Sequence, residues 1–206
     1  MKRKTTNGNL SVYAGPMFAG KSTALIAELE ESLESGAVNY VVKPSIDTRY
    51  DDTDIVSHDG TSLQKTTGLT VFRLGVDEIV PTELLLSKEV DLLLIDEAQF
   101  FSSNLCETAV QDYLRNGIDV VAVGLDLDSE GVPFGSMPTL LAYATKAYKL
   151  SSVCSVCGSE ATRTFRKLSA KSHSQVLIGG TDHYEPRCYE HWLRGQKEKL
   201  SFLLSE

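Results

Sequence analysis

The segment Gly15-Pro16-Met17-Phe18-Ala19-Gly20-Lys21-Ser22 has the spacing of a phosphate-binding loop. Glycines allow backbone N–H groups to converge on phosphate oxygens, and the positive end of a following helix faces the same anion. In such a loop the Lys21 ammonium reaches the β- and γ-phosphates, and the Ser22 hydroxyl is a ligand of Mg²⁺. The alternative is a glycine turn with an incidental lysine. The strand expected before the loop and the helix expected after it favour ATP bound with magnesium.

Two adjacent carboxylates, Asp96 and Glu97, follow the apolar residues 92–95. A carboxylate at the carboxyl end of a buried strand beside a phosphate loop is the usual second anchor of magnesium, and we assign this role to Asp96, directly or through water. Glu97 is a candidate base for an attacking hydroxyl group. Paired acids can also be solvated strand ends, but phosphoryl transfer needs both an anchor and a base. Of Phe100 and Phe101, we expect at least one in the core and the other against an aromatic ligand.

A second set of reactive residues lies in the last third of the chain. Cys154 and Cys157 form one pair with two residues between them, and Cys188 and His191 form another. Two such pairs on a short segment are typical of a tetrahedral Zn²⁺ site. Because all four positions are thiol or imidazole, no position remains for water. The spacing therefore predicts a structural zinc site whose metal stabilises a small lobe.

The elements that position these residues alternate along the chain. Apolar runs predict buried strands, helical spacing of apolar residues predicts helices, and a polar stretch at 44–67 predicts a functional loop. We expect strands at 10–14, 38–42, 70–74, 90–95 and 118–125, and helices at 22–34, 103–116 and 137–147. This alternation indicates an α/β fold with a parallel sheet flanked by helices.

The composition changes near residue 151, where Cys, Gly, Ser and Thr become frequent. We therefore divide the chain into a flexible N-terminus (1–9), a nucleotide-binding domain (10–150), a small zinc-binding lobe (151–192), and a C-terminal tail (193–206). A formal charge of -8 argues against a nucleic-acid partner, because phosphate backbones attract Lys and Arg. We find neither a signal peptide nor a membrane-spanning run, and expect a cytoplasmic protein without a membrane partner.

Taken together and in this order, the motifs resemble the cytosolic-type (type II) thymidine kinase family over residues 10 to about 192. The resemblance is carried by the phosphate loop, the four zinc-ligand positions, Lys43 with Asp47-Thr48-Arg49-Tyr50, His58-Asp59, Asp96-Glu97-Ala98-Gln99-Phe100-Phe101, Gly124-Leu125-Asp126 with Pro133-Phe134-Gly135, and Ile178-Gly179-Gly180 with Tyr184. It implies a RecA-like parallel sheet with a zinc-bearing lobe that also binds the nucleoside. It also implies transfer of the γ-phosphoryl group of ATP to the 5′-hydroxyl of thymidine, a homotetramer, and feedback inhibition by dTTP.

The family's functional residues carry over onto matching positions of this chain. Glu97 would take the proton from the 5′-hydroxyl. ATP would contact Gly15, Pro16, Met17, Phe18, Ala19, Gly20, Lys21, Ser22, Asp96, Glu97, Ala98 and Gln99. Backbone groups of Gln175, Val176, Leu177, Ile178 and Gly179 would hold the thymine, Tyr184 would pack over the nucleoside, and Met17, Phe100 and Leu125 would line the base pocket.

Two positions depart from the family pattern and affect the expected substrate. Ser129 stands where many members carry an aromatic residue, and Gly60 stands where many have a basic one. Loss of a ring would weaken stacking on the base by about 1–3 kcal/mol. Three alternatives therefore remain: a kinase for deoxyuridine or deoxycytidine, a RecA-like ATPase that acts on DNA, and a nucleotide-binding regulator without catalysis. The intact Lys21, Ser22, Asp96 and Glu97 argue against the regulator.

Overall fold

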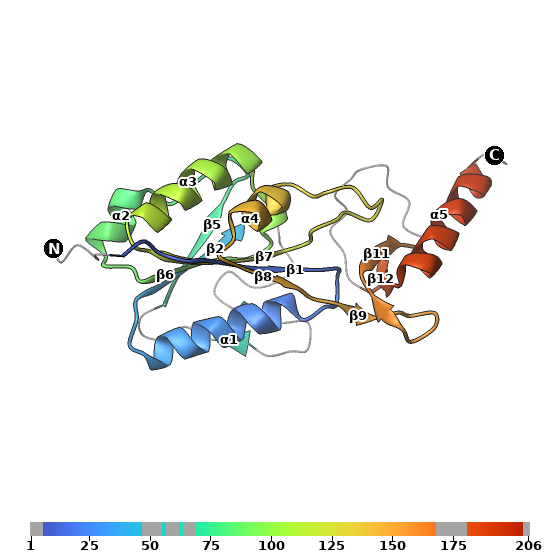
Figure 1. The fold of residues 1–206 in the computed structure, drawn as a ribbon, viewed down its shortest axis with the longest axis horizontal. Helices are drawn as coiled ribbons and strands as arrows, with labels where there is room; N and C mark the ends of the chain where they lie inside the picture. Colours follow the sequence, from blue (N-terminus) through green and yellow to red (C-terminus); the bar gives the residue numbers. More distant parts are fainter. Residues whose placement is uncertain (1–5, 47–54, 57–61, 64–68, 168–180, 204–206) are drawn as a thin grey trace.

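The computed structural model describes residues 6–46, 55–56, 62–63, 69–167 and 181–203. Its centre is a parallel sheet of six strands in the order β5-β2-β6-β7-β1-β8 (Figure 1). The strands are β1 (Leu10–Ala14), β2 (Asn39–Pro44), β5 (Leu69–Leu74), β6 (Leu92–Ile95), β7 (Asp119–Gly124) and β8 (Lys146–Lys149). In a parallel sheet all carboxyl ends lie at one edge, so the residues that follow β6, β1 and β7 are brought together.

Helices cover both faces of this sheet. Helix α1 (Lys21–Glu34) lies on one face, and α2 (Thr82–Ser87), α3 (Ser103–Arg115) and α4 (Met137–Tyr143) lie on the other (Figure 1). A short 3₁₀ helix, η1 (Ala98–Phe100), follows β6. The predicted α/β architecture, a parallel sheet flanked by helices, is therefore confirmed.

The central strands are apolar because both of their faces are buried. On β6, Leu92 and Leu94 pack in the cluster that contains Leu25 and Leu29 of α1. The alternate residues of the same strand, including Leu93, belong to the cluster under α3 and α4. This alternation fixes the register of β6, because a shift by one residue would exchange its two faces.

The C-terminal third forms a small lobe at one end of the sheet (Figure 1). It contains β9 (Ser152–Val153) paired with β10 (Glu160–Ala161), β11 (Arg163–Arg166) paired with β12 (Tyr184–Arg187), and helix α5 (Tyr189–Leu203). Helix α5 is tied to the segment after β7: the Trp192 indole N–H and the Gln196 amide donate to the Ser129 carbonyl, at 3.1 and 2.6 Å.

The structure differs from the sequence prediction at several elements. The helix predicted at 137–147 ends at Tyr143, because Ala144 is extended and the Thr145 N–H donates to the Leu10 carbonyl, which leads the chain into β8. Helix α2 was not predicted, and a short pair of strands, β3 (Ile55–Val56) and β4 (Ser62–Leu63), lies in the predicted loop 44–67. No helix in the described ranges is both long and apolar enough to span a membrane.

The segments expected at the two ends of the chain are described only in part. Within the expected N-terminal segment 1–9, the Gly8 N–H donates to the Leu114 carbonyl and the Asn9 N–H donates to the Asp119 carboxylate. A Cβ on Gly8 would lie 2.1 Å from the Ile118 carbonyl oxygen, so the described part of this segment packs closely on the domain. The predicted tail at 193–206 begins inside α5, which continues to Leu203.

Candidate functional site

The phosphate-binding loop connects β1 to α1, as the sequence predicts. Gly15 cannot carry a side chain, because its Cβ would lie 2.5 Å from the Leu150 carbonyl oxygen. Gly20 precedes α1 with φ 77°, in the left-handed region that favours glycine. Gly20 has no side chain that could cap the start of α1, so the positive end of this helix fits an anion. This geometry matches the phosphate groups of a nucleotide.

Two side chains form hydrogen bonds with the backbone of the loop. The Lys21 ammonium donates to the Pro16 carbonyl at 2.5 Å and therefore lies across the loop. The Met17 N–H donates to the Thr164 hydroxyl at 3.0 Å, and both residues are buried. Thr164 belongs to β11 of the lobe, so this contact joins the lobe to the phosphate loop. The sequence held no signal for it, because a threonine in a polar segment has many possible positions.

The carboxylate pair follows β6 directly, at the same edge of the sheet as the phosphate loop. One oxygen of Asp96 accepts the backbone N–H of Glu97 at 2.9 Å. Glu97 has φ 47° and ψ 46°, a left-handed conformation that is unfavourable for a residue with a Cβ. Strain of this kind is concentrated at functional positions, where the surrounding structure maintains it.

Ala98 and Gln99, which were predicted to contact ATP, are buried at 0% and 2% exposure. The Gln99 amide donates to Glu97 at 2.6 Å and accepts the Leu125 N–H at 3.0 Å. It therefore connects the predicted base with the first residue after β7. That residue, Leu125, is itself one of the predicted nucleoside contacts.

The other predicted nucleoside contacts are only partly described. Phe100 is half-buried and meets Phe134 edge-on, with ring centroids 5.8 Å apart, whereas Phe101 is buried in the core as expected for one of the two. Tyr184 is buried on β12, with the Arg166 guanidinium 5.6 Å from its ring centroid. The predicted thymine-binding residues Gln175, Val176, Leu177, Ile178 and Gly179 lie outside the described residues. The nucleoside side of the site therefore stays a prediction.

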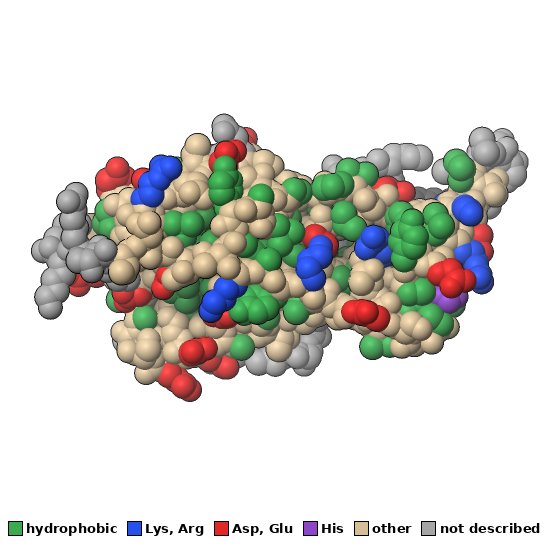
Figure 2. All heavy atoms as spheres, in the orientation of Figure 1, with side chains coloured by type: hydrophobic (Ala, Val, Ile, Leu, Met, Phe, Trp, Pro, Cys, Tyr) green, Lys and Arg blue, Asp and Glu red, His purple; other side chains and the backbone are tan. Residues whose placement is uncertain are grey.

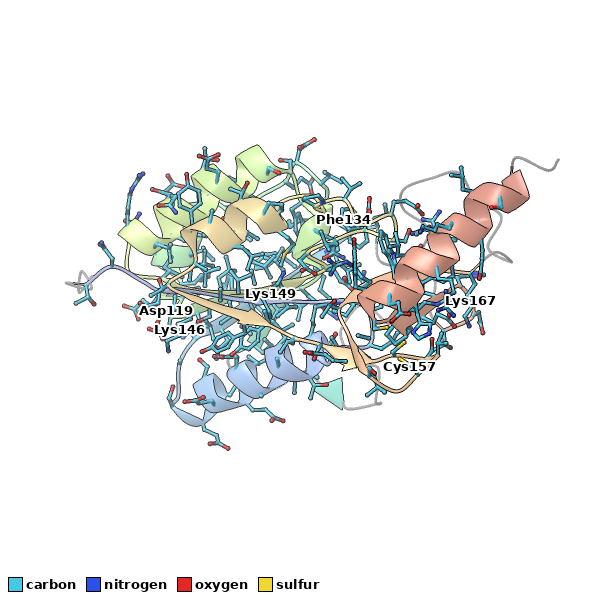
Figure 3. All side chains as sticks on the ribbon, turned by 45° about the vertical axis from the view of Figure 1, so that its right-hand side comes forward. Asp119, Phe134, Lys146, Lys149, Cys157 and Lys167 are labelled. Atoms are coloured by element: carbon cyan, nitrogen blue, oxygen red, sulfur yellow. The ribbon has the colours of Figure 1, made fainter. Side chains whose placement is uncertain are left out.

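An ion pair that the sequence analysis missed flanks the loop. The Lys149 ammonium, at the end of β8, contacts the Asp126 carboxylate in the segment after β7. Strand β1 lies between β7 and β8, so this pair spans the strand that leads into the phosphate loop. In Figure 3, β8 runs from Lys146 to Lys149, and Lys149 is the nearer of the two to the lobe.

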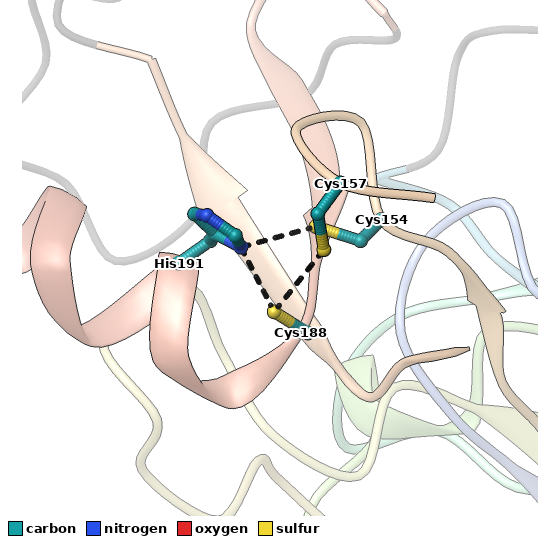
Figure 4. Close-up of side chains that lie close together, drawn as sticks. All are labelled: Cys154, Cys157, Cys188 and His191. Carbon is teal, nitrogen blue, oxygen red and sulfur yellow. Dashed lines mark hydrogen bonds between the residues drawn. The ribbon is translucent and has the colours of Figure 1, made fainter. Parts of the chain in front are cut away.

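The four predicted metal ligands meet in the lobe (Figure 4). The ligand atoms of Cys154, Cys157, Cys188 and His191 all lie within 4.8 Å of one another. The Sγ atoms of Cys157 and Cys188 are 3.9 Å apart, and Cys154 Sγ is 3.9 Å from His191 Nδ1. Zinc–sulfur bonds of about 2.3 Å in a tetrahedron place two sulfurs about 3.8 Å apart. The cluster therefore has the size and the donor types that fit zinc.

The surroundings of Cys154 favour its thiolate. Burial alone raises the pKa of this thiol, but the backbone N–H groups of Cys188, Val156 and Cys157 point toward the sulfur and lower its pKa to about 6. A thiolate is the form that binds a metal. The predicted ligands therefore lie close together, and the Cys154 thiolate that the surroundings favour is the form that binds a cation.

A phosphate-binding loop after β1, with two carboxylates at the end of β6 two strands away in the same sheet, defines an α/β nucleotide-binding protein of the P-loop class. The family model for thymidine kinase matches residues 8–192. A thymidine kinase of Bacteroides fragilis (strain YCH46) is 39% identical over 191 residues, covering 93% of this chain and 90% of that protein. The thymidine kinase of Coprothermobacter proteolyticus is 38% identical and the match covers 91% of this chain and 91% of that protein. The thymidine kinase of Pyrobaculum aerophilum is 39% identical and the match covers 89% of this chain and 98% of that protein. The chain belongs to the thymidine kinase family.

Proposed function

We propose that this protein is an ATP-dependent thymidine kinase that transfers the γ-phosphoryl group of ATP to the 5′-hydroxyl of thymidine and forms dTMP and ADP. The observation that carries this proposal is the placement of Glu97 on a strained turn after β6, at the sheet edge where β1 enters the phosphate loop. A phosphate-binding loop alone would also suit an ATPase. A fixed carboxylate beside it supplies the base that a hydroxyl acceptor needs.

The chain's own residues provide positioning and charge, which are the main requirements of phosphoryl transfer. The backbone N–H groups of the loop and the Lys21 ammonium hold the β- and γ-phosphates. Glu97 orients the 5′-hydroxyl and accepts its proton as the new P–O bond forms. In this proposal the side chains of Met17, Phe100, Leu125 and Tyr184 surround the nucleoside, while the predicted thymine contacts at 175–179 lie outside the described residues. Together these residues exclude water, which would otherwise hydrolyse ATP.

The two metals have different roles. Ser22 and Asp96 would hold magnesium, which neutralises charge on the β- and γ-phosphates when bound. Cys154, Cys157, Cys188 and His191 would hold structural zinc, which stabilises the lobe. Because Thr164 of this lobe accepts the Met17 N–H, the lobe also fixes one amide of the phosphate loop.

Further properties follow from the family. We propose a cytoplasmic homotetramer that dTTP inhibits, with thymidine as the main acceptor and deoxyuridine as a second one. The four residues of β8 are exposed at the edge of the sheet, which leaves an edge strand open to a second copy of the chain. Light scattering after size exclusion would measure the assembly, and titration with dTTP in the kinase assay would measure inhibition.

A matched pair of substrates tests the reaction. The purified protein is incubated with magnesium and ATP labelled at the γ-phosphate, together with 3′-deoxythymidine or 5′-deoxythymidine. Because the 5′-hydroxyl is the proposed acceptor, label should move to 3′-deoxythymidine only. Label on 5′-deoxythymidine, or release of labelled phosphate without transfer to either compound, would contradict the proposal.

The face in Figure 2 also bears on the alternative of an ATPase that acts on DNA. Lys and Arg side chains are scattered singly there among acidic and uncharged atoms, and they form no continuous stripe on that face. A protein that follows single-stranded DNA needs a basic groove with aromatic residues for stacking. Neither this face nor the net charge of -8 favours that reading.

A further inference from the structure

The side chain of Gln99 occupies a buried position between two parts of the site. It is 2% exposed, and both ends of its amide are engaged. Nε2 donates to Glu97 Oε2 at 2.6 Å, and Oε1 accepts the N–H of Leu125 at 3.0 Å. Reversing the amide would direct its NH₂ group at the Leu125 N–H, so the two contacts together fix the orientation.

Neighbouring residues form a cage that leaves this amide little freedom. A Cβ on Gly124 would lie 2.6 Å from Gln99 Oε1, so only glycine gives the amide its room. Gly135 has φ +51°, and a Cβ there would lie 1.8 Å from the Gln99 carbonyl oxygen. The buried Ser136 hydroxyl donates to the Ala98 carbonyl at 2.6 Å. These contacts hold both the backbone and the side chain of the turn after β6.

The strained backbone of Glu97 explains why such a cage is needed. A residue with a Cβ is rarely stable with φ 47° and ψ 46°, and it persists only where its surroundings fix it. The Gln99 amide fixes the carboxylate end of the same residue. We propose that Gln99 is a positioning residue, which orients the Glu97 carboxylate toward the acceptor hydroxyl and links it to the nucleoside wall at Leu125, and that it is not a ligand of ATP. This role rests on the kinase reaction proposed above.

The substitution Gln99→Glu tests the donor end with almost no change of shape. A glutamate keeps an acceptor for the Leu125 N–H but faces Glu97 with a second carboxylate. We expect kcat at neutral pH to fall by about tenfold or more, because small displacements of a catalytic group are costly. Lowering the pH should restore part of kcat, since two close carboxylates hold one shared proton and this proton replaces the amide donor.

The pH profile and the KM for Mg-ATP separate the possible roles. In Gln99→Glu, kcat should fall as pH rises from about 5.5 to about 8, whereas the wild type should not lose activity over that range. The KM for Mg-ATP should stay within about twofold of the wild type, because a positioning residue does not contact the nucleotide. A several-fold increase in this KM with an unchanged kcat would instead identify Gln99 as an ATP ligand and overturn the proposal.

Two further variants and a control complete the experiment. Gln99→Leu should lose kcat at every pH, and Gly124→Ala, whose Cβ displaces the amide, should lose kcat with Glu97 and Gln99 intact. Gln111→Leu, a half-buried glutamine on α3, should keep the wild-type profile. If Gln99→Leu does not fold, the profile of Gln99→Glu decides. If Gln99→Glu has the same kcat and pH profile as the unsubstituted protein, the positioning role of Gln99 is refuted but the kinase function is not. If the unsubstituted protein forms no dTMP, the proposed kinase function is refuted as well.

Discussion

The contact between Thr164 and the phosphate loop allows a quantitative test of how the lobe supports nucleotide binding. Thr164→Val removes one hydroxyl group with little change in volume. The Met17 N–H, buried and 3.0 Å from that hydroxyl, then loses its acceptor. An unsatisfied buried donor costs about 1–3 kcal/mol. For a chain of this size each kcal/mol lowers Tm by about 2–4 °C, so we expect a decrease of about 2–12 °C.

Thermal unfolding and nucleotide binding should change together in this variant. Because Met17 lies in the loop that we propose holds the phosphates, the Kd for Mg-ATP should increase while zinc content stays at that of the wild type. The exposed neighbour provides a matched control, Thr162→Val, which should change neither quantity. If Thr164→Val and Thr162→Val had the same Tm and the same Kd, the lobe would not support the loop through this bond.

Three further predictions concern the base, the metal site and the half-buried Tyr13. Glu97→Gln should lower kcat by about 10²-fold or more while the Kd for Mg-ATP stays near that of the wild type, and near-normal turnover would remove Glu97 from its role. Cys154→Ser should lose zinc, measured by elemental analysis, and destabilise the lobe relative to Ser155→Ala; full activity in a metal-free preparation would contradict this. Burial, and after it the hydrogen bond to Glu28, raises the pKa of Tyr13 above its ordinary value of 10.0. The protonated phenol therefore stabilises the fold below pH 10, and this stabilisation is lost as the pH rises through the pKa of the folded state. The urea midpoint should therefore fall less steeply between about pH 9 and pH 11 in Tyr13→Phe than in the wild type, and equal slopes would refute the assignment.

The sequence predicts elements best where periodicity reflects burial. Strand β6 is apolar at every residue because both of its faces are covered, and it was predicted together with the sheet. Strand β8 was missed because its four residues are exposed at a sheet edge, where no apolar pattern is required. Helix α2 has six residues, too few for a helical period to stand out.

The same contrast holds for the candidate site. The phosphate loop and the metal cluster depend on residue types at short fixed spacings, so the sequence alone predicts both. The contact of Met17 with Thr164 joins residues 147 positions apart, and the anchor of Ser129 to Trp192 joins residues 63 apart. Contacts of this length depend on how the lobe sits on the sheet, which no local pattern specifies.

The most direct test of the central claim is a panel of nucleosides offered one at a time with Mg-ATP, with each monophosphate measured by chromatography. We predict that dTMP forms well ahead of every other product, and that Ser129 is then a tolerated variation in a thymidine kinase. ADP that appears only when DNA is added, or a clear preference for another nucleoside such as deoxycytidine, would contradict the assignment.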